Sequence, residues 1–372
     1  MALPDDNNTQ VSQHVQAELD NTRYACSSLE VLTGGTANFI FKGLLTEPLD
    51  DGTQEIAIKH GKGFVATQPG FQLTTDRCRV EKECLDALSR LPPTSRGCLV
   101  RTPKLYSFNA ETNTQLQEYL GGSVDLKTYA LKHFSDGRDE SRKPSCGDIG
   151  QGLGAWLRSF HSWATLPEQS AFKEVVKSNK ALQSLKHMVN YSYLVSTVDN
   201  FPSILGGARE TFELVKKMAA DELENSEQVQ IIHGDFWTGN AILPDQPWTK
   251  DSQTSVFIID WEMCQLGVRP LDLGQMIAEL YELFLFKGIE EGKWLIEGFA
   301  SGYGYVDDDF AFRTAIHVGT HLVCWGSRVP GWGSESQIQH VVQRGMELIQ
   351  RAWAKDRAWF DAGDLACLFH KP

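Results

Sequence analysis

The sequence predicts an α+β protein of two lobes, with a sheet-rich lobe followed by a mostly helical lobe. Strand-like runs broken by turns fill the chain up to about residue 120, and helical apolar periods follow Gly121-Gly122. The length of 372 residues also exceeds the size at which one hydrophobic core usually stops growing. We expect a helical N-terminal extension at 1–28, a first lobe at 29–120 and a second lobe at 121–372.

The first lobe should be an antiparallel sheet with one inserted helix. LEVLTGGTANFIFKGLL leads across a turn to QEIAIKH, and CLVRTPKLYSFN and TNTQLQEYL follow later in the chain. Between them, apolar residues at 80, 84, 87, 88 and 91 have helical spacing, and Pro92-Pro93 should stop that helix.

The second lobe should consist mainly of long helices. One apolar stripe contains Ile149, Leu153, Trp156, Leu157 and Phe160. Further helical periods lie near 207–224, 271–287, 289–302, 309–327 and 335–355.

Composition narrows the class of partner. A formal charge of −13 argues against a nucleic acid or an anionic membrane surface, which would require a basic face. The N-terminus has no secretory pattern, and no uncharged apolar run approaches the ~18 residues needed to cross a bilayer. The eight cysteines are scattered without zinc-site or disulfide spacings. We therefore expect a cytoplasmic protein with reduced thiols, no membrane and no obligatory protein partner.

Two acidic motifs carry the strongest chemical signal. HGDFWTGN places Asp235 five positions before Asn240, and VFIIDWE ends an apolar run at Asp260. Phosphoryl transfer needs a carboxylate to orient the attacking hydroxyl, and oxygen ligands for the metal that neutralises the phosphates. Asp235 fits the first task, and Asn240 with Asp260 fits the second. The plainer alternative is that Asp235 caps a turn and Asp260 ends a strand.

A lysine in the first lobe supports the same chemistry. In IAIK, strand alternation puts Ala57 and Lys59 on one face, where the ammonium could reach phosphates beside a flat base. Glu81 or Glu83 could hold this lysine, and the helical spacing favours Glu81. A solvated lysine at a strand end is the alternative.

A Gly-Gly pair precedes this strand. Gly34 and Gly35 in LTGGTANFIF would let backbone N–H groups approach phosphate oxygens. An ordinary hairpin turn explains the pair equally well.

Taken in order, the Gly-Gly turn, Lys59, Glu81, QEYL at 117–120, HGDFWTGN and IDWE resemble the aminoglycoside phosphotransferase and choline kinase superfamily. The resemblance covers about residues 30 to 350, and the HGDxxxGN and IDWE motifs are highly specific for it. The tail HLVCWGSRVPGWGSESQIQHVVQRGMELI is most similar to the methylthioribose kinase branch, which includes the fungal 4-hydroxytryptamine kinases.

This resemblance implies a protein-kinase-like two-lobe fold and a nucleotide site. Lys59, paired with Glu81, would contact the α and β phosphates of ATP, and main-chain groups of Glu118 and Leu120 would hold adenine. The lysine and the carboxylates of the second lobe would serve the same triphosphate.

The resemblance also implies roles in the second lobe. Asp235 would be the catalytic base, and Asn240 and Asp260 would bind Mg²⁺. Asp272 would brace the catalytic loop through His233.

The acceptor site is less well defined by the sequence. His317, His321 and Trp325 form one helical stripe that would line the acceptor site or pack against a neighbouring helix, and its HxxxH pair lacks a third zinc ligand. Glu279 and Glu282 could bind a cationic amine, but we expect a solvated face there. The candidate acceptor-site residues are Trp237, Glu262, His321, Trp325 and Arg328, with Trp332 near enough in sequence to join them.

The predicted function is ATP- and Mg²⁺-dependent phosphorylation of a hydroxyl group on a small metabolite of aminoalcohol, sugar or hydroxyindole type. A nucleotide-binding pseudokinase is the alternative, although Lys59, Asp235 and Asp260 all persist. A protein substrate is disfavoured because Asp260 runs almost directly into GVRPLDLG without an activation segment.

Overall fold

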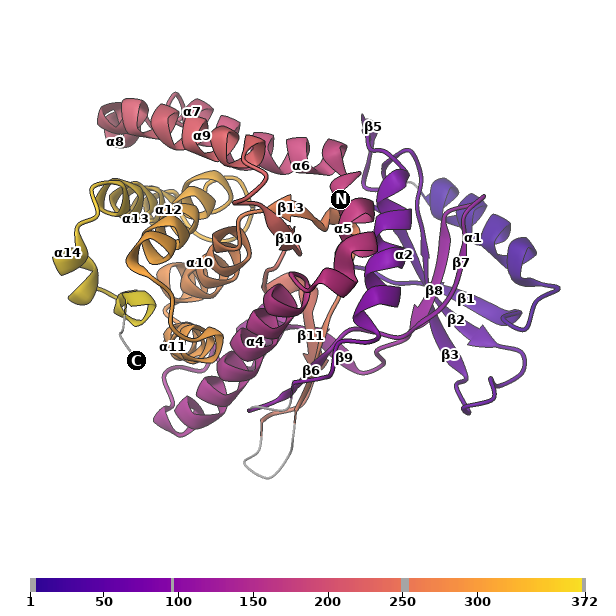
Figure 1. The fold of residues 1–372 in the computed structure, drawn as a ribbon. Coiled ribbons are helices and arrows are strands. Elements are labelled where there is room, and N and C mark those ends of the chain that lie inside the picture. The colour runs from indigo at the N-terminus through magenta and orange to yellow at the C-terminus, as the bar shows by residue number, and fades with distance from the viewer. Residues whose placement is uncertain (1–4, 95–96, 249–253, 370–372) are drawn as a thin grey trace. The chain divides into compact units, whose positions relative to one another are not determined.

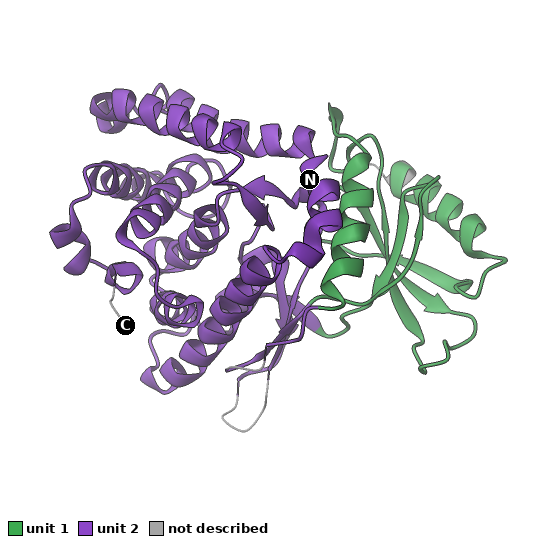
Figure 2. Ribbon diagram, in the orientation of Figure 1, with its two compact units in different colours: residues 1–90, 102–122 green, residues 91–101, 123–372 purple. Residues whose placement is uncertain are grey.

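The computed structural model describes residues 5–94, 97–248 and 254–369, so residues 1–4 of the expected N-terminal extension lie outside the described part. Contacts divide the chain into two compact units, one of residues 1–90 and 102–122 and the other of 91–101 and 123–372 (Figures 1 and 2). The first is the sheet-rich unit and the second is mostly helical, which confirms the predicted α+β class.

An antiparallel five-stranded sheet forms the centre of unit 1, in the order β1-β2-β3-β8-β7. The strands are β1 Cys26–Val31, β2 Phe39–Leu45, β3 Glu55–His60, β7 Leu105–Asn109 and β8 Thr114–Glu118. A small hairpin of β4 Phe64–Val65 and β5 Gln68–Gln72 and the helices α1 Asp5–Leu19 and α2 Asp76–Leu88 complete the unit. The hairpin was not expected from the sequence.

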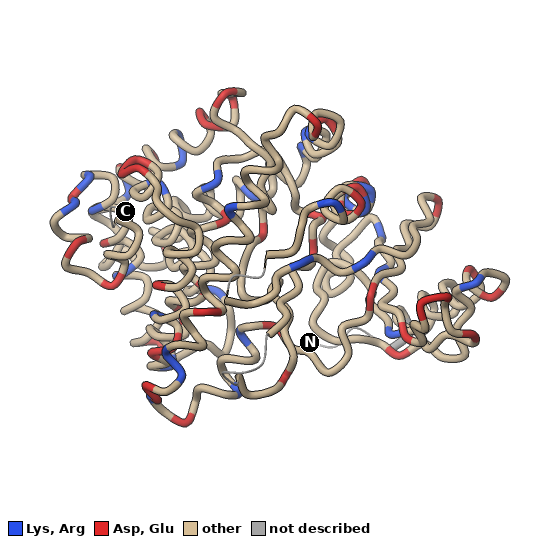
Figure 3. Tube along the Cα trace, turned by 60° about the horizontal axis from the view of Figure 1, so that its bottom comes forward, with Lys and Arg blue, Asp and Glu red and all other residues tan. Residues whose placement is uncertain are grey.

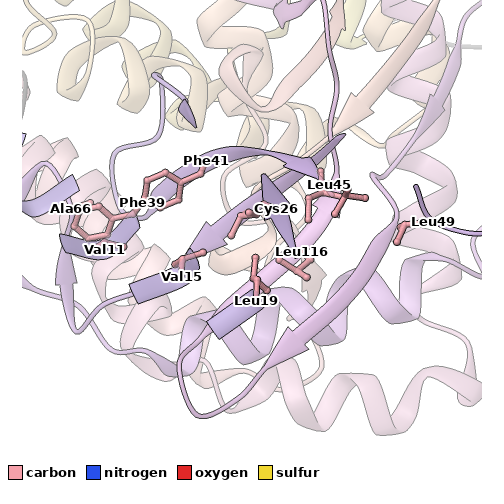
Figure 4. Packing of buried hydrophobic residues seen from close by; sticks show 12 residues of the cluster. Val11, Val15, Leu19, Cys26, Phe39, Phe41, Leu45, Leu49, Ala66 and Leu116 are labelled. Carbon is pink, nitrogen blue, oxygen red and sulfur yellow. The ribbon is translucent and has the colours of Figure 1, made fainter. Parts of the chain in front are cut away.

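The N-terminal helix belongs to the hydrophobic core of unit 1. Val11, Val15 and Leu19 follow one another at intervals of four along α1, so they share one face of the helix. That face packs with Phe41 and Leu116 of the sheet (Figure 4). The helix expected as an extension therefore stabilises the unit that carries Lys59.

Two small sheets of unit 2 hold the loops in which the acidic motifs lie. One has the order β6-β12-β11-β9, and the other pairs β10 with β13. The strands are β6 Leu99–Arg101, β9 Ser123–Asp125, β10 Gln230–Ile232, β11 Ala241–Pro244, β12 Ser255–Ile258 and β13 Gln265–Gly267. Residues 91–101 lie in unit 2, although the sequence favoured the first lobe, because β6 pairs in parallel with β12.

Helices make up the rest of unit 2. They are α3 Leu126–His133, α4 Lys143–Trp163, α5 Ser170–Lys177, α6 Lys180–His187, α7 Tyr193–Thr197, α8 Pro202–Leu205, α9 Arg209–Glu224, α10 Pro270–Lys287, α11 Glu291–Tyr303, α12 Asp308–Cys324, α13 Glu335–Trp353 and α14 Arg357–Asp361. Short helical turns are η1 Glu140–Arg142, η2 Pro167–Gln169, η3 Met188–Ser192, η4 Gly206–Ala208, η5 Thr238–Asn240, η6 Trp261–Met263 and η7 Ala366–Phe369. The five predicted helical periods correspond to α9 through α13, whereas α5 to α8 were not expected.

Glycines let α4 and α11 approach closely. A Cβ at Gly154 would lie 2.1 Å from the carbonyl oxygen of Phe299, and one at Gly302 would lie 2.1 Å from that of Gln151. Such distances are far below van der Waals contact, so these positions require glycine. The close packing fixes α4, which carries His161 into the site described below.

Charged residues and cysteines occur in both units. Acidic and basic residues are interspersed along both units (Figure 3). The eight cysteines form no disulfide among the described residues, and seven of them are buried. Within the same residues, no helix has the length and apolarity that a bilayer crossing requires.

Candidate active site

The loop of HGDFWTGN leaves β10 through a left-handed glycine. Gly234 has φ +81°, and a Cβ there would lie 2.2 Å from the carbonyl oxygen of Met263. The carboxylate of Asp272 accepts the N–H of His233 at 2.9 Å and the N–H of Gly234 at 3.0 Å. Asp272 thus holds the loop through the main-chain N–H groups of His233 and Gly234.

Asp272 is itself held by a buried chain of hydrogen bonds. Nε2 of His161 lies 3.0 Å from Oδ2 of Asp272, and Nδ1 of His161 lies 2.9 Å from the hydroxyl of Tyr303. A neutral imidazole that donates from Nε2 and accepts at Nδ1 satisfies both bonds. Burial opposes ionisation of Asp272, but the hydrogen bonds that its carboxylate accepts from His161 and from the N–H of His233 outweigh it, so the pKa of Asp272 is lowered.

The ring of His233 ties the loop to the strand that carries the second acidic motif. Its Nε2 lies 3.0 Å from the carbonyl oxygen of Ile259 and donates to it, while Nδ1 accepts the N–H of Asp235 at 3.2 Å. Trp261 packs on the ring with centroids 4.3 Å apart. Burial lowers the pKa of His233, which favours the neutral tautomer that these bonds need.

Two side chains that the sequence did not reveal hold the carboxylate of Asp235. Nε2 of Gln275 donates to Oδ1 at 2.7 Å, and Nζ of Lys186 lies 3.2 Å from the same oxygen. Lys186 also donates to Oε1 of Gln275 at 2.6 Å, which closes a triangle of polar contacts. Asp235 keeps 29% of its side chain exposed, whereas Lys186 keeps only 7%. The protein therefore holds this carboxylate through Oδ1, and part of the side chain remains accessible to solvent.

The two candidate metal ligands lie at adjacent strand ends. Asn240 directly precedes β11 and Asp260 follows β12 by two residues, and the N–H of Ile259 donates to the carbonyl of Asn240 at 3.0 Å. The side-chain nitrogen of Asn240 donates to both the carbonyl and the carboxylate of Asp235 at 3.0 and 3.3 Å. This leaves its amide oxygen as the atom able to bind a cation.

Asp260 has an unusual backbone conformation. Its φ of +65° and ψ of +60° lie in the left-handed region, which non-glycine residues seldom adopt outside functional sites. A carboxylate oxygen of Asp260 lies within 4.8 Å of one of Glu262, which is buried. These oxygen donors fit a hard divalent cation.

In unit 1, the structure decides between the two glutamates that could pair with Lys59. Nζ of Lys59 lies 2.8 Å from the carboxylate of Glu81, which also accepts from Gln115 at 3.1 Å. Glu83 instead contacts Lys82 at 3.2 Å. Glu81 is buried and Lys59 keeps 12% of its side chain exposed, so the pair is well shielded from solvent.

Gly34 and Gly35 differ in their surroundings. Gly34 is exposed, with φ +108° and no heavy atom within 4 Å of an added Cβ. A Cβ at Gly35 would lie 2.6 Å from the side chain of Ile40. Gly34 thus supplies a left-handed backbone that is open on its Cβ side, whereas a larger residue at Gly35 would require the Ile40 side chain to shift.

Two of the candidate acceptor-site residues lie in or near the HGDFWTGN loop. Trp237 is half-buried, and Nζ of Lys127 lies 5.4 Å from its ring centroid. His321 is buried, with Nε2 3.0 Å from Glu279, and Glu279 accepts from the hydroxyl of Thr238 in the loop at 3.3 Å.

The other candidates near the end of α12, and His317 within it, have different partners. Trp325 donates to the side chain of Asn190 at 3.3 Å, and exposed Arg328 donates to Thr197 at 3.0 Å. His317 is fully buried and bonded to Tyr191 at 3.0 Å, so helix packing accounts for it.

The expectation that Glu279 and Glu282 form a solvated face was wrong. Glu279 is only 6% exposed and Glu282 only 1%. Glu279 can be buried because Lys127 and His321 come from other helices to neutralise and hydrogen-bond it. Neither partner is near it in the sequence.

The buried histidines predict a dependence of stability on pH. Burial lowers the pKa of His161, His233 and His317 below the ordinary value of 6.5. Between that value and each folded-state pKa, the unfolded chain binds more protons than the folded chain. The stabilisation is therefore complete above pH 6.5 and declines as the pH falls below it.

We expect the free energy of unfolding to decrease by up to about 1.4 kcal/mol per pH unit for each of these histidines below that pH. Urea unfolding at pH 7.5, 6.5 and 5.5 would measure the change. Equal unfolding free energies at all three values would contradict the neutral buried state of these rings.

Comparison with known proteins identifies the family. The sequence profile of the phosphotransferase enzyme family (APH) matches residues 50–311. The chain belongs to this family. This phosphotransferase is 30% identical to the phosphotransferase FrzJ of Cladobotryum sp, with 91% of each chain covered. It is 21% identical to the 4-hydroxytryptamine kinase of Psilocybe cubensis, over 91% of this chain and 90% of that one.

Solved structures agree on the fold of this phosphotransferase. A choline/ethanolamine kinase family protein from Mesorhizobium loti superposes with a TM-score of 0.51 at 13% identity, covering 96% of this chain and 98% of that one. The GDP complex of aminoglycoside 2'-phosphotransferase-IIIa gives 0.50 at 15% identity, covering 94% and 99%. The resemblance that the motifs indicated is thus confirmed, and the protein is a small-molecule kinase.

Proposed function

We propose that this protein transfers the γ-phosphoryl group of ATP, with Mg²⁺, to a hydroxyl group of a small metabolite in the cytoplasm. The observation that carries the proposal is the carboxylate of Asp235, which Gln275 and Lys186 orient while part of it stays accessible. A carboxylate held in this way can accept a hydrogen bond from an incoming hydroxyl and orient that oxygen for attack.

The metal would be held by Asn240 and Asp260. The amide oxygen of Asn240 and the carboxylate of Asp260 are ligands that Mg²⁺ prefers, and both come from rigid strand ends. Glu262 adds a buried carboxylate beside Asp260. When bound, Mg²⁺ would neutralise negative charge on the phosphates during transfer.

Unit 1 would hold the nucleotide. Lys59, kept in place by Glu81, would contact the α and β phosphates, and the open backbone at Gly34 would allow close approach of phosphate oxygens, with Gly35 supporting the turn. The N–H of Glu118 donates to the carbonyl of Lys104, so an adenine contact from this residue would use its carbonyl oxygen, with Leu120 next to it. The GDP bound to the aminoglycoside phosphotransferase relative supports a nucleotide site in this fold.

In the proposed reaction, the residues bind and orient rather than form covalent bonds. Asp235 accepts the hydrogen bond of the acceptor hydroxyl and takes its proton as the oxygen attacks the γ-phosphorus in line. Lys59 keeps a positive charge against the triphosphate as the bond to the leaving oxygen breaks. His233, Asp272 and His161 keep the loop in the geometry that this attack needs.

Release of ADP from ATP in the presence of Mg²⁺ and a panel of hydroxylated amines, sugars and hydroxyindoles tests the proposal. Phosphorylation of at least one panel member supports it. Nucleotide binding without turnover of any acceptor would instead indicate a pseudokinase.

Asp260→Ala should weaken binding of the magnesium nucleotide. Loss of a direct carboxylate ligand is expected to cost at least the ~10- to 100-fold in metal affinity that loss of a supporting residue typically costs. Calorimetric titration with a non-hydrolysable ATP analogue would measure it, with and without Mg²⁺. Equal affinity for the magnesium complex in wild type and variant would remove Asp260 from the metal site.

A further inference from the structure

Unit 2 contains a cavity whose described lining includes none of the residues that the proposed function uses. It measures about 250 Å³ and is lined by parts of α10, α11 and η7 and by the loop after α11. Leu273, Tyr303 and Leu368 are buried members of its wall, whereas Glu297 and Tyr305 are exposed. A wall that is partly buried and partly exposed is typical of a concave site that a small molecule can enter.

Two residues of this wall are connected to the HGDFWTGN loop. Leu273 directly follows Asp272 in α10, and the carboxylate of Asp272 accepts two main-chain N–H groups of the loop. The hydroxyl of Tyr303 lies 2.9 Å from Nδ1 of His161, and Nε2 of His161 lies 3.0 Å from the same carboxylate. Burial raises the pKa of Tyr303 to about 12, so its hydroxyl stays protonated and donates to His161. The cavity therefore borders both supports of Asp272, the helix that carries it and the hydrogen-bonded chain that orients it.

Among the lining residues that the structure describes, Glu297 alone carries a charge. It forms no ion pair within the described part of the chain. Burial, followed by the charge of Glu297, raises the pKa of the Cys367 thiol to about 12, which shows that this carboxylate lies close to the η7 wall of the cavity. A protonated thiol is a poor nucleophile, so the cavity is suited to reversible binding. A cationic group on the ligand would give the carboxylate of Glu297 a partner of opposite charge.

The rest of the lining favours an aromatic body for the ligand. Leu273 and Leu368 supply apolar surface, and Tyr305 is an aromatic side chain that is 53% exposed. A cavity of roughly 150 Å³ holds benzene, so the larger volume here suits one ring with a short chain. The guanidinium carbon of Arg158 lies 5.2 Å from the ring centroid of Tyr303, so a second positive charge is disfavoured beside that ring. The ligand should therefore place its ring at the buried wall and its cationic group at the exposed carboxylate.

We propose that this cavity binds a small arylalkylamine as an effector, with its ring against Leu273 and Tyr303 and its ammonium group at Glu297. Binding stabilises the HGDFWTGN loop through His161 and Asp272. The structure contains the cavity and the complete hydrogen-bonded chain together, so a ligand that binds this conformation favours the state in which the loop is held. The effector site goes beyond the proposed function, because its ligand needs no hydroxyl group and receives no phosphoryl group.

Three probes that share one ring and differ in charge test the class of ligand. They are 2-phenylethylamine, 2-phenylacetamide and phenylacetate, none of which has an alcohol group to be phosphorylated. In thermal-shift measurements without nucleotide, the amine should raise the melting temperature most, the amide less and the carboxylate not at all, because a ligand that binds only the folded protein stabilises it. No shift with the amine, or equal shifts with all three probes, overturns the inference.

Variants of two exposed lining residues test the location. Glu297→Gln should weaken binding of 2-phenylethylamine by about two- to fivefold, the effect of losing an exposed ion pair, and should leave binding of the amide unchanged. Ser301 also lines the cavity, one helical turn from Glu297, so Ser301→Phe should prevent binding of both by filling the space. Glu213→Gln and Ser196→Phe change exposed residues of α9 and α7 and serve as matched controls. Wild-type affinity in Ser301→Phe shows that the amine binds elsewhere and contradicts the assignment.

Hydrogen exchange tests the connection to the loop. With 2-phenylethylamine at ten times its Kd, the amide protons of His233 and Gly234 should exchange up to about tenfold more slowly, because the ligand must dissociate before the loop opens. Exchange in the hairpin of β4 and β5 should not change, since this hairpin belongs to unit 1. Tyr303→Phe keeps the ring but removes the hydroxyl, so the amine should still bind while the loop loses its protection. Full protection in Tyr303→Phe, or no protection in the wild type, rules out the proposed connection.

Binding and exchange need no turnover, so they separate the effector site from the proposed function. If the amine binds and protects the loop although no acceptor is phosphorylated, the kinase proposal fails and the effector site stands. With an acceptor that is phosphorylated, the amine should raise kcat, since the stabilised loop carries Asp235, and Ser301→Phe should not respond. A higher KM for the acceptor with unchanged kcat would instead place the amine in the acceptor site, which overturns the inference and leaves the proposed function intact.

Discussion

Asp235→Asn is expected to lower kcat by about 10²- to 10⁴-fold, the range that general-base catalysis usually contributes. The asparagine is nearly isosteric and still offers an oxygen to the amide of Gln275 and to Lys186, so the loop should keep its shape. It cannot take the proton of the acceptor hydroxyl.

Single-turnover kinetics with Mg²⁺-ATP would measure the loss of kcat. Titration with the nucleotide alone should give an affinity within about twofold of that of the wild type, because the substitution removes an interaction that forms only in the transition state. Asp221→Asn is a suitable control, since Asp221 is exposed and forms an ion pair with Lys217 on the surface of α9. Normal turnover by Asp235→Asn would remove this residue as the base.

The grouping of Asp235 and Asn240 in one loop was predictable because these residues are close together in sequence. Strand alternation likewise placed Lys59 on the face opposite the buried Ile56 and Ile58. In these cases, the positions of the side chains follow from the geometry of one short segment. The choice of Glu81 over Glu83 followed from the side of α2 that carries the apolar stripe.

The support behind the loop was not predictable in the same way. Lys186 and His161 lie on helices with no recognisable motif, and each meets its partner only through the tertiary fold. The one local signal for Lys186 was its position four residues after the buried Leu182, on the apolar side of α6. Periodicity shows which face of a helix is buried, but it does not show what covers that face.

Glu279 and Glu282 illustrate the same limit of prediction, here for residues that the sequence predicts to be exposed but that are buried. A glutamate is exposed by default, and only a partner brought by another helix overcomes the cost of burial. For Glu279 that partner is 152 residues away along the chain in Lys127. A pair of residues so far apart in sequence cannot be predicted from a local stretch of the chain.

Asp272→Ala should have the largest effect on stability among single changes near the site. The variant leaves the N–H groups of His233 and Gly234 and the Nε2 of His161 without their acceptor inside a region closed to water. Breaking a buried, hydrogen-bonded charge network typically costs about 3–5 kcal/mol. We expect the free energy of unfolding to fall by about that amount.

Urea unfolding monitored by tryptophan fluorescence would measure this loss, because Trp261 packs directly on His233. Asp309→Ala is the matched control, since its side chain is 78% exposed. Asp272→Asn separates charge from hydrogen bonding: its oxygen can accept from one main-chain N–H, while its amide hydrogens would face a second donor. An intermediate loss is therefore expected for Asn. If Asp272→Ala unfolds at the same urea concentration as the wild type, the loop does not depend on this carboxylate, and its order must come from the contacts of His233 alone.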